Sequence, residues 1–129
     1  MTIVIPPSYM ISAAQQVDVG VGCLARLPDW LKSVGSSRPL LIMDSFFARH
    51  DAGKTIIGQL QADAELHVIE APQGEPKMAY LEDMLITARS VSCDAIIGIG
   101  GGSVLDSAKI IGICLGADKP VAHYEMIKN

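Results

Sequence analysis

The residues with the clearest chemistry are three consecutive glycines, Gly100, Gly101 and Gly102, which are followed by Ser103 and Asp106. Glycine has no Cβ, so its backbone amide can come close to a ligand. At the start of a helix the first amides have no partner within the helix, and the helix dipole favours an anion there. An apolar run precedes the glycines and a helix-period segment follows them. The turn therefore predicts a phosphate-binding site, and a pyrophosphate suits it well.

The spacing of this turn differs from the better-known phosphate motifs. Gly98, Gly100 and Ser103 match G-x-G-x-x-[small], but no clear acidic residue follows about twenty positions later on a second strand. The G-x-x-x-x-G-K-[ST] spacing of an ATP-binding loop is also missing. A purely structural interpretation stands beside the functional one. In it Ser103 is the N-cap of the next helix, Asp106 completes a capping-box-like arrangement, and Lys109 pairs with Asp106 on the helix surface.

The elements that must position this turn follow from an alternation of apolar runs and helix-period segments, which predicts an α/β fold. We expect an open, mostly parallel sheet flanked by helices, as one nucleotide-binding domain over 1–129. Strands are expected over 3–5, 17–21, 40–43, 66–70, 95–99 and 120–123. Helices are expected over 24–34, 52–62, 81–88 and 104–115, and a loop rich in proline over 71–76. Ligands bind such sheets at the carboxyl ends of the strands, which is where the glycine turn lies.

Composition excludes several kinds of partner. The net charge is −4, and a basic face for nucleic acid or an anionic membrane is not visible. No run approaches the ~18 apolar residues of a membrane span. The first 17 residues are uncharged, but they lack a basic n-region and are interrupted by prolines and glutamines. We therefore expect a cytoplasmic protein that binds neither nucleic acid nor membrane.

Cysteine and histidine form no recognisable site. The cysteines are odd in number and widely spaced, which fits neither a disulfide framework nor a zinc site, so we expect them to be reduced. The histidines never show the i, i+4 spacing that puts two metal ligands on one helix face. The residues concerned are Cys23, Cys93, Cys114, His50, His67 and His123. The sequence thus predicts no metal site in this stretch.

The glycine turn and its surroundings resemble a known enzyme family. Gly100-Gly101-Gly102-Ser103-x-x-Asp106-x-Ala108-Lys109 is similar to the G-G-G-S-x-x-D-x-A-K motif of the iron-dependent alcohol dehydrogenases. The context agrees, with a strand that ends in Asp44, a loop that contains Glu75-Pro76, and the approach Cys93-Asp94-Ala95-Ile96-Ile97-Gly98. The resemblance covers essentially the whole chain.

The resemblance implies a Rossmann-like, dehydroquinate-synthase-like N-terminal domain that binds the dinucleotide. In the family a helical domain follows and holds a divalent metal, iron or in some relatives zinc, and that domain is absent from this sequence. The resemblance assigns the cofactor's pyrophosphate to Gly101, Gly102 and Ser103, with Gly100 shaping the turn and Asp106 belonging to the same cofactor-binding motif.

The resemblance also assigns an adenosine end. The acid after the second core strand contacts the adenosine ribose in the family, and Asp44 matches it, while Glu75 lies on the adenosine side. A carboxylate accepts bonds from the ribose hydroxyls and repels a 2′-phosphate, so Asp44 favours NAD over NADP. The structural alternative is that Asp44 only caps the next helix.

The implied function is hydride transfer between an alcohol and a nicotinamide in a full-length, metal-dependent alcohol dehydrogenase. The small alcohol or aldehyde substrate and a second copy of the chain, in a homo-oligomer, are the further partners implied. The 129 residues would be a truncated N-terminal part without catalytic residues or metal ligands, and inactive alone. Two alternatives stay open: a relative of glycerol dehydrogenase and dehydroquinate synthase, and a non-catalytic nucleotide-binding module.

Overall fold

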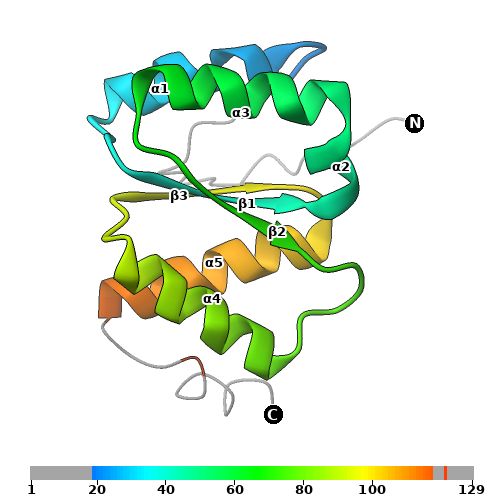
Figure 1. The fold of residues 1–129 in the computed structure, drawn as a ribbon, viewed down its shortest axis with the longest axis vertical. Coiled ribbons are helices and arrows are strands. Elements are labelled where there is room, and N and C mark those ends of the chain that lie inside the picture. Colours follow the sequence, from blue (N-terminus) through cyan, green and yellow to red (C-terminus); the bar gives the residue numbers. More distant parts are fainter. Residues whose placement is uncertain (1–18, 118–120, 122–129) are drawn as a thin grey trace, which may run out of the picture.

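A computed structural model describes residues 19–117 and residue 121, and one parallel sheet lies at its centre (Figure 1). Its strands are β1 (Pro39–Asp44), β2 (His67–Ala71) and β3 (Ala95–Ile99), in the order β2-β1-β3. In the register, Leu40 lies between His67 on one side and Ile96 on the other. The central strand β1 is buried over its four apolar residues, as expected for a strand with neighbours on both edges and helices on both faces.

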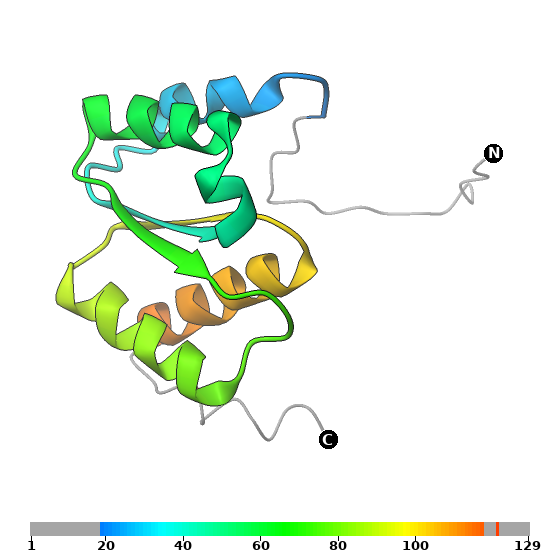
Figure 2. The ribbon, with the colours of Figure 1, turned by 45° about the vertical axis from the view of Figure 1, so that its right-hand side comes forward.

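Helices cover both faces of the sheet (Figures 1 and 2). The short 3-10 helix η1 (Cys23–Arg26), α1 (Leu27–Ser33) and α3 (Asp51–Asp63) lie on one face, and α4 (Met78–Ser90) and α5 (Gly102–Ala117) lie on the other. The five-residue α2 (Ser45–Arg49) follows the carboxyl end of β1. This is the open parallel α/β sheet that the sequence predicts, and that prediction is confirmed.

The alternation of side chains along β1 separates the two cores. Leu40 and Ile42 pack in the cluster with α4 and α5, whereas Leu41 and Met43 pack in the cluster with α1, α2 and α3. Successive strand residues point to opposite faces, so one run of four apolar residues supplies both cores. The sheet is therefore fixed from both sides, and the positions of its strand ends are fixed with it.

Asp94, just before β3, links the segments that enter β1 and β3 at the amino edge of the sheet by hydrogen bonds. Its carboxylate accepts from the Ser36 hydroxyl at 2.6 Å, from the Ser37 backbone N–H at 2.8 Å and hydroxyl at 3.2 Å, and from the Arg38 backbone N–H at 3.1 Å. The Asp94 backbone N–H donates in turn to the Arg38 carbonyl at 3.1 Å. These bonds join the residues that enter β1 to the residue that enters β3.

Several predicted boundaries differ from the structure. The helix expected over 24–34 is divided into η1 and α1 because Pro28, which lacks an N–H, fits the first turn of α1. Within the strand expected over 17–21, residues 19–21 form no strand but an exposed turn, in which Gly22 adopts φ of 78°. Residues 17 and 18 and the strand expected over 3–5 lie outside the described residues. The same holds for the strand expected over 120–123, apart from the buried Val121.

Over residues 19–117 and 121, the structure contains no helix that combines the length and the apolar character of a membrane span.

Candidate functional site

The carboxyl ends of the three parallel strands meet at one edge of the sheet, and the predicted site residues lie along it (Figure 1). β1 ends in Asp44, β3 leads into the glycine turn, and β2 leads into the loop 72–76. The structure brings Asp44 and Gly100 into direct contact. A Cβ built on Gly100 would lie 3.2 Å from the Asp44 Cβ and 2.8 Å from the Val104 Cγ2. Only a residue without a side chain fits between the strand end and the helix at this point.

The other two glycines of the turn face open space. A Cβ built on Gly101 or Gly102 would meet no atom within 4 Å. The Gly101 carbonyl accepts from the backbone N–H groups of Val104 and Leu105, each at 3.1 Å, so Gly101 occupies the N-cap position of α5. The backbone N–H groups of Gly102 and Ser103 have no partner within the helix. Gly101 and Gly102 are exposed and their side-chain positions are empty, so the turn has room for the phosphate group that the sequence predicts for it.

The capping-box interpretation of Ser103 and Asp106 is wrong. Because Gly101 is the N-cap, Ser103 lies inside the first turn of α5, where its carbonyl accepts from the Ser107 hydroxyl at 2.7 Å. Asp106 and Lys109 are exposed, and no ion pair joins them in the part of the chain that the structure describes. The Ser103 side chain is half-buried beside the turn, so capping does not explain its presence there.

Asp44 does cap the helix that follows it. Its Oδ1 accepts from the Phe47 backbone N–H at 3.1 Å, which makes Asp44 the N-cap of α2. The cap bond of the structural alternative is therefore present, but it does not exclude a ligand. The cap bond involves Oδ1, and a carboxylate has acceptor sites left on its second oxygen. Asp44 is half-buried at the edge of the sheet, so the carboxylate remains partly open to solvent.

The loop after β2 packs on the start of α5, and Glu75 lies on its outer side. Pro72 and Gly74 of the loop enclose a cavity of about 10 Å³ together with Ser103 and Val104. Glu75 is exposed and does not line that cavity. The structure thus brings the backbone of the loop, rather than the Glu75 carboxylate, against the glycine turn.

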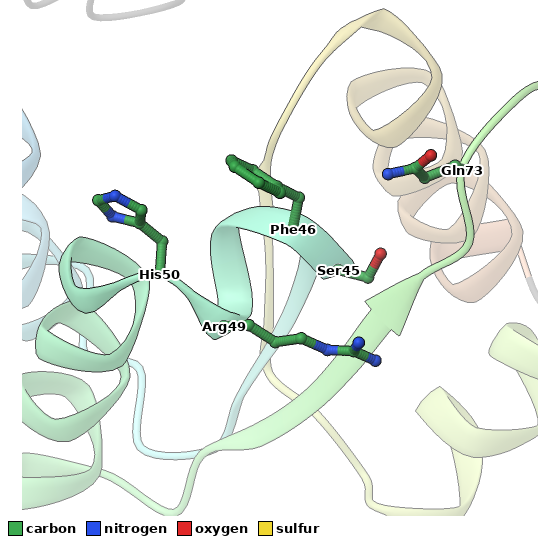
Figure 3. Close-up of a pocket in the computed structure, with 5 residues that line it drawn as sticks. All are labelled: Ser45, Phe46, Arg49, His50 and Gln73. Carbon is green, nitrogen blue, oxygen red and sulfur yellow. The ribbon is translucent and has the colours of Figure 1, made fainter.

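A hollow of about 280 Å³ opens beside Asp44, between α2 and the loop after β2 (Figure 3). This size approaches the lower end of the range for small-molecule sites, about 300 Å³. Its lining combines hydroxyl, aromatic, guanidinium, imidazole and amide groups, contributed by Ser45, Phe46, Arg49, His50 and Gln73. None of these residues was predicted to line a site, since α2 was not predicted and no role was assigned to Gln73 in the loop. The signal that could have located most of them is the run Ser-Phe-Phe-Ala-Arg-His directly after Asp44, which places hydroxyl, aromatic and basic residues beside a strand end.

Three contacts position the side chains around this hollow. Arg49 Nη2 lies 3.5 Å from Glu70 Oε2, so α2 and the end of β2 are joined by an ion pair. The rings of Phe46 and His50 lie 6.4 Å apart and are tilted by 32°. His50 Nδ1 accepts from the Ala52 backbone N–H at 3.4 Å, which places the ring at the N-terminus of α3.

The histidines and cysteines are not brought together. His50 lies at the carboxyl edge of the sheet and His67 opens β2 at the amino edge, while His123 lies outside the described residues. Within residues 19–117 and 121, no group of three or more His, Cys, Asp or Glu side chains converges on a position that could hold a metal. The described residues therefore do not fit a metal ion.

Comparison with known proteins identifies relatives over most of the chain. A family model for iron-containing alcohol dehydrogenase matches residues 14–129. The NAD-dependent methanol dehydrogenase of Bacillus methanolicus is 23% identical over 126 residues, which are 97% of this chain and 31% of that protein. The long-chain-alcohol dehydrogenase 1 of Geobacillus thermodenitrificans is 31% identical over 107 residues, which are 82% of this chain and 27% of that protein.

Solved structures share the fold. A 1,3-propanediol oxidoreductase superposes with a TM-score of 0.68 at 27% identity, over 74% of this chain and 25% of that one. The sulfoacetaldehyde reductase of Bifidobacterium kashiwanohense, solved in complex with NAD+, superposes with a TM-score of 0.71 at 22% identity, over 81% of this chain and 28% of that one. The chain thus spans less than a third of the length of each of these relatives.

Proposed function

The chain belongs to the iron-containing alcohol dehydrogenase family, and on this basis we propose that it forms the NAD-binding part of an enzyme that transfers hydride between an alcohol and NAD. The observation that carries the proposal is the packing of the Asp44 Cβ against Gly100, which places an acidic residue next to the glycine turn at the carboxyl edge of a parallel sheet. The name of the methanol dehydrogenase relative, which is NAD-dependent, supports the choice of cofactor.

In this proposal the parts of the dinucleotide bind one after another at the carboxyl ends of the strands, in the order β3, β1, β2. The pyrophosphate binds the open amides of Gly101, Gly102 and Ser103 at the end of β3. The adenosine ribose lies at the end of β1, where the free acceptor sites of Asp44 receive its hydroxyls. Continuing in the same direction, from β3 past β1 toward β2, the adenosine reaches the hollow between α2 and the loop after β2.

This orientation also indicates that the described residues do not contact the nicotinamide, where the reaction takes place. When bound, NAD supplies the carbon that accepts or donates the hydride. With the adenosine lying toward β2, the nicotinamide extends past β3 in the opposite direction, away from every contact proposed here. The residues of this chain bind and orient the cofactor, and we assign none of them as catalytic. Glu75 and Asp106 are both exposed. In this proposal they have auxiliary roles in cofactor binding, Glu75 on the adenosine side and Asp106 in the helix that follows the glycine turn.

The metal ion, the small alcohol or aldehyde, a homo-oligomeric assembly and a cytoplasmic location belong to the proposal for the whole protein. The family is named for iron, and zinc is the alternative. Because the described residues hold no set of metal ligands, no step of the reaction is assigned to a metal bound by them.

A titration with NAD that follows thermal stability tests the proposal. A ligand that binds only the folded state stabilises it by RT ln(1 + [L]/Kd), about 2.7 kcal/mol when [L] is one hundred times Kd. Gly101→Val should abolish this stabilisation, because its side chain projects into the open space that the pyrophosphate needs. The matched control is Gly58→Val in α3, where an added Cβ also meets no atom within 4 Å. Stabilisation of the Gly101 variant equal to that of the control would refute the glycine turn as the site.

A further inference from the structure

Arg49 is a positive charge on α2, the helix that Asp44 caps, and therefore lies near the ribose position proposed above. It lines the hollow next to Asp44, and in Figure 3 its side chain extends toward β2, below Ser45. An arginine near the adenosine ribose is the usual means by which dinucleotide-binding folds accommodate a 2′-phosphate. A guanidinium binds phosphate through two parallel N–H···O bonds, which makes it a strong phosphate ligand. The residue composition of the hollow alone would therefore favour NADP.

Glu70 changes that expectation. Its Oε2 lies 3.5 Å from Arg49 Nη2, and in the sheet register Glu70 pairs with Met43, one position before the pair of Asp44 with Ala71. The backbone of Glu70 is also held in place, because the Tyr80 hydroxyl donates to its carbonyl at 2.7 Å. The guanidinium of Arg49 thus has an anionic partner on β2, the strand that pairs with the one ending in Asp44.

We propose that Glu70 is a specificity-determining residue, which withholds Arg49 from a 2′-phosphate through the Arg49–Glu70 ion pair. This inference rests on the proposed function, since it takes Asp44 as the ribose-binding residue. Asp44 repels the 2′-phosphate directly, whereas Glu70 acts through Arg49. The preference for NAD therefore depends on both acids, and Arg49 is a phosphate ligand that becomes available when Glu70 is neutral.

The expected effect is moderate because the pair is exposed. The side chains of Arg49 and Glu70 are 77% and 47% exposed, and ion pairs of this kind are weak in water. Glu70→Gln releases Arg49 and removes one repulsive charge, so we expect the Kd for NADP to fall about fivefold. The Kd for NAD should change less than about twofold, because NAD presents a hydroxyl where NADP presents the phosphate. Substitutions of Glu70 and Arg49 by glutamine lie on the surface and should leave the fold intact.

The experiment measures the Kd of NAD and of NADP for the wild type, Glu70→Gln, Arg49→Gln and the double variant, at low and at high salt. In the double variant the gain in NADP affinity should disappear, because the phosphate ligand is gone. The matched control is Glu65→Gln, which removes one acid from a comparable exposed pair, Arg38 with Glu65 at 3.4 Å, at the amino edge of the sheet. This control should leave both Kd values unchanged.

The outcomes separate the two proposals. If Gly101→Val abolishes NAD binding but Glu70→Gln leaves the ratio of the two Kd values unchanged, the role of Glu70 is refuted and the proposed function stands. If Glu65→Gln raises NADP affinity as much as Glu70→Gln does, the effect is one of net charge and the role of Glu70 is again refuted. If the wild type binds neither dinucleotide, or the Gly101 variant binds NAD normally, the proposed function fails and the inference fails with it.

Discussion

The two edges of the sheet use the same residue type in different ways. At the amino edge Asp94 accepts hydrogen bonds from Ser36, Ser37 and Arg38, and these bonds engage both of its carboxylate oxygens. At the carboxyl edge the Asp44 side chain accepts one hydrogen bond, from the Phe47 backbone N–H at 3.1 Å. An acid whose oxygens are saturated by its own chain stabilises the fold, whereas an acid with acceptor sites left can also bind a ligand. The carboxylate at the first edge thus stabilises the fold, and the one at the second edge has the free acceptor sites that the proposed cofactor site requires.

The glycines at the carboxyl edge show the same division within a single turn. Gly100 is enclosed by Val104 and Asp44, and the two glycines that follow it face open space. Gly100 is thus required because no side chain fits there, whereas Gly101 and Gly102 leave room for the proposed ligand. Substitutions that change stability without changing NAD binding, or the reverse, test this comparison.

The largest effect is expected for Gly100→Val. Its Cβ alone would lie 2.8 Å from the Val104 Cγ2, and Val104 is a stiff, β-branched residue in the core. We expect the free energy of unfolding to fall by about 3 kcal/mol, as for strongly overpacked sites. Urea unfolding measures it, with Gly101→Val as the comparison, for which a change of about 1 kcal/mol or less is expected. Equal losses in the two variants would mean that Gly100 is not confined as described.

The next largest effect is expected at the amino edge. Asp94→Ala leaves the N–H groups of Ser37 and Arg38 without their acceptor, and we expect a loss of about 2 kcal/mol, typical of hydrogen bonds to a charged group. Affinity for NAD should be unchanged, because this edge lies opposite to the proposed site. Urea unfolding and the NAD titration on the same protein give both values. A weakened NAD affinity in a variant that is still folded would contradict the division between the edges.

A pair of substitutions at Asp44 separates its two roles. Asp44→Ala removes the cap of α2 and should cost about 1 kcal/mol, whereas Asp44→Ser keeps a capping oxygen and should cost about 0.5 kcal/mol or less. Both remove the carboxylate, so both should weaken NAD binding, by about tenfold, the worth of a hydrogen bond to a charged group. Calorimetric titration measures the affinity. If the serine variant binds NAD as the wild type does, the carboxylate of Asp44 acts only as a cap.

The sequence predicts the strands and long helices well because their signals are local. The apolar runs that became β1 and β3 and the segment that became α5 carry their own periodicity. The five-residue α2 has too few residues for a periodic signal, and it forms because Asp44 caps it and Ala48 packs on the core. The structural interpretation places the N-cap of α5 at Ser103, since serine is a preferred cap, but the helix begins earlier and its N-cap is Gly101, two residues before the serine.

The sequence predicts those parts of the candidate site that a contiguous motif or a family resemblance indicates. The glycine turn is contiguous in sequence, and Asp44 and Glu75 were assigned through the resemblance. The hollow joins α2 to the loop after β2, and the pair of Arg49 with Glu70 joins a helix to a strand from separate parts of the chain. Such contacts depend on the order β2-β1-β3, which local patterns do not specify, so they could not be predicted from the sequence.

The smallest effect is the pH dependence of stability that Asp94 contributes. The hydrogen bond from Ser36, followed by those from the backbone of Ser37 and Arg38, lowers the pKa of the Asp94 carboxyl from 3.8 to about 2. Because the folded-state pKa lies below the unfolded-state value, the contribution is fully present above pH 4 and is lost as the pH falls toward 2. The carboxylate is exposed, so solvent screening keeps this contribution below the loss expected for Asp94→Ala.

The isosteric variant Asp94→Asn isolates that contribution, since the other carboxylates titrate alike in both proteins and cancel in the difference. The free energy of unfolding of the wild type minus that of the variant should be constant from pH 7 to about pH 4 and should shrink between pH 4 and pH 2. Urea unfolding at closely spaced pH values measures this difference. The difference in free energy of unfolding between the wild type and Asp44→Ser should change when NAD is added. The difference for Asp94→Asn should not change, because Asp94 lies at the edge opposite to the proposed site. If the difference for Asp94→Asn stays constant down to pH 2, the charge of Asp94 contributes nothing to the stability of the fold. The contrast between Asp94 and Asp44 would then rest only on their different effects on NAD binding.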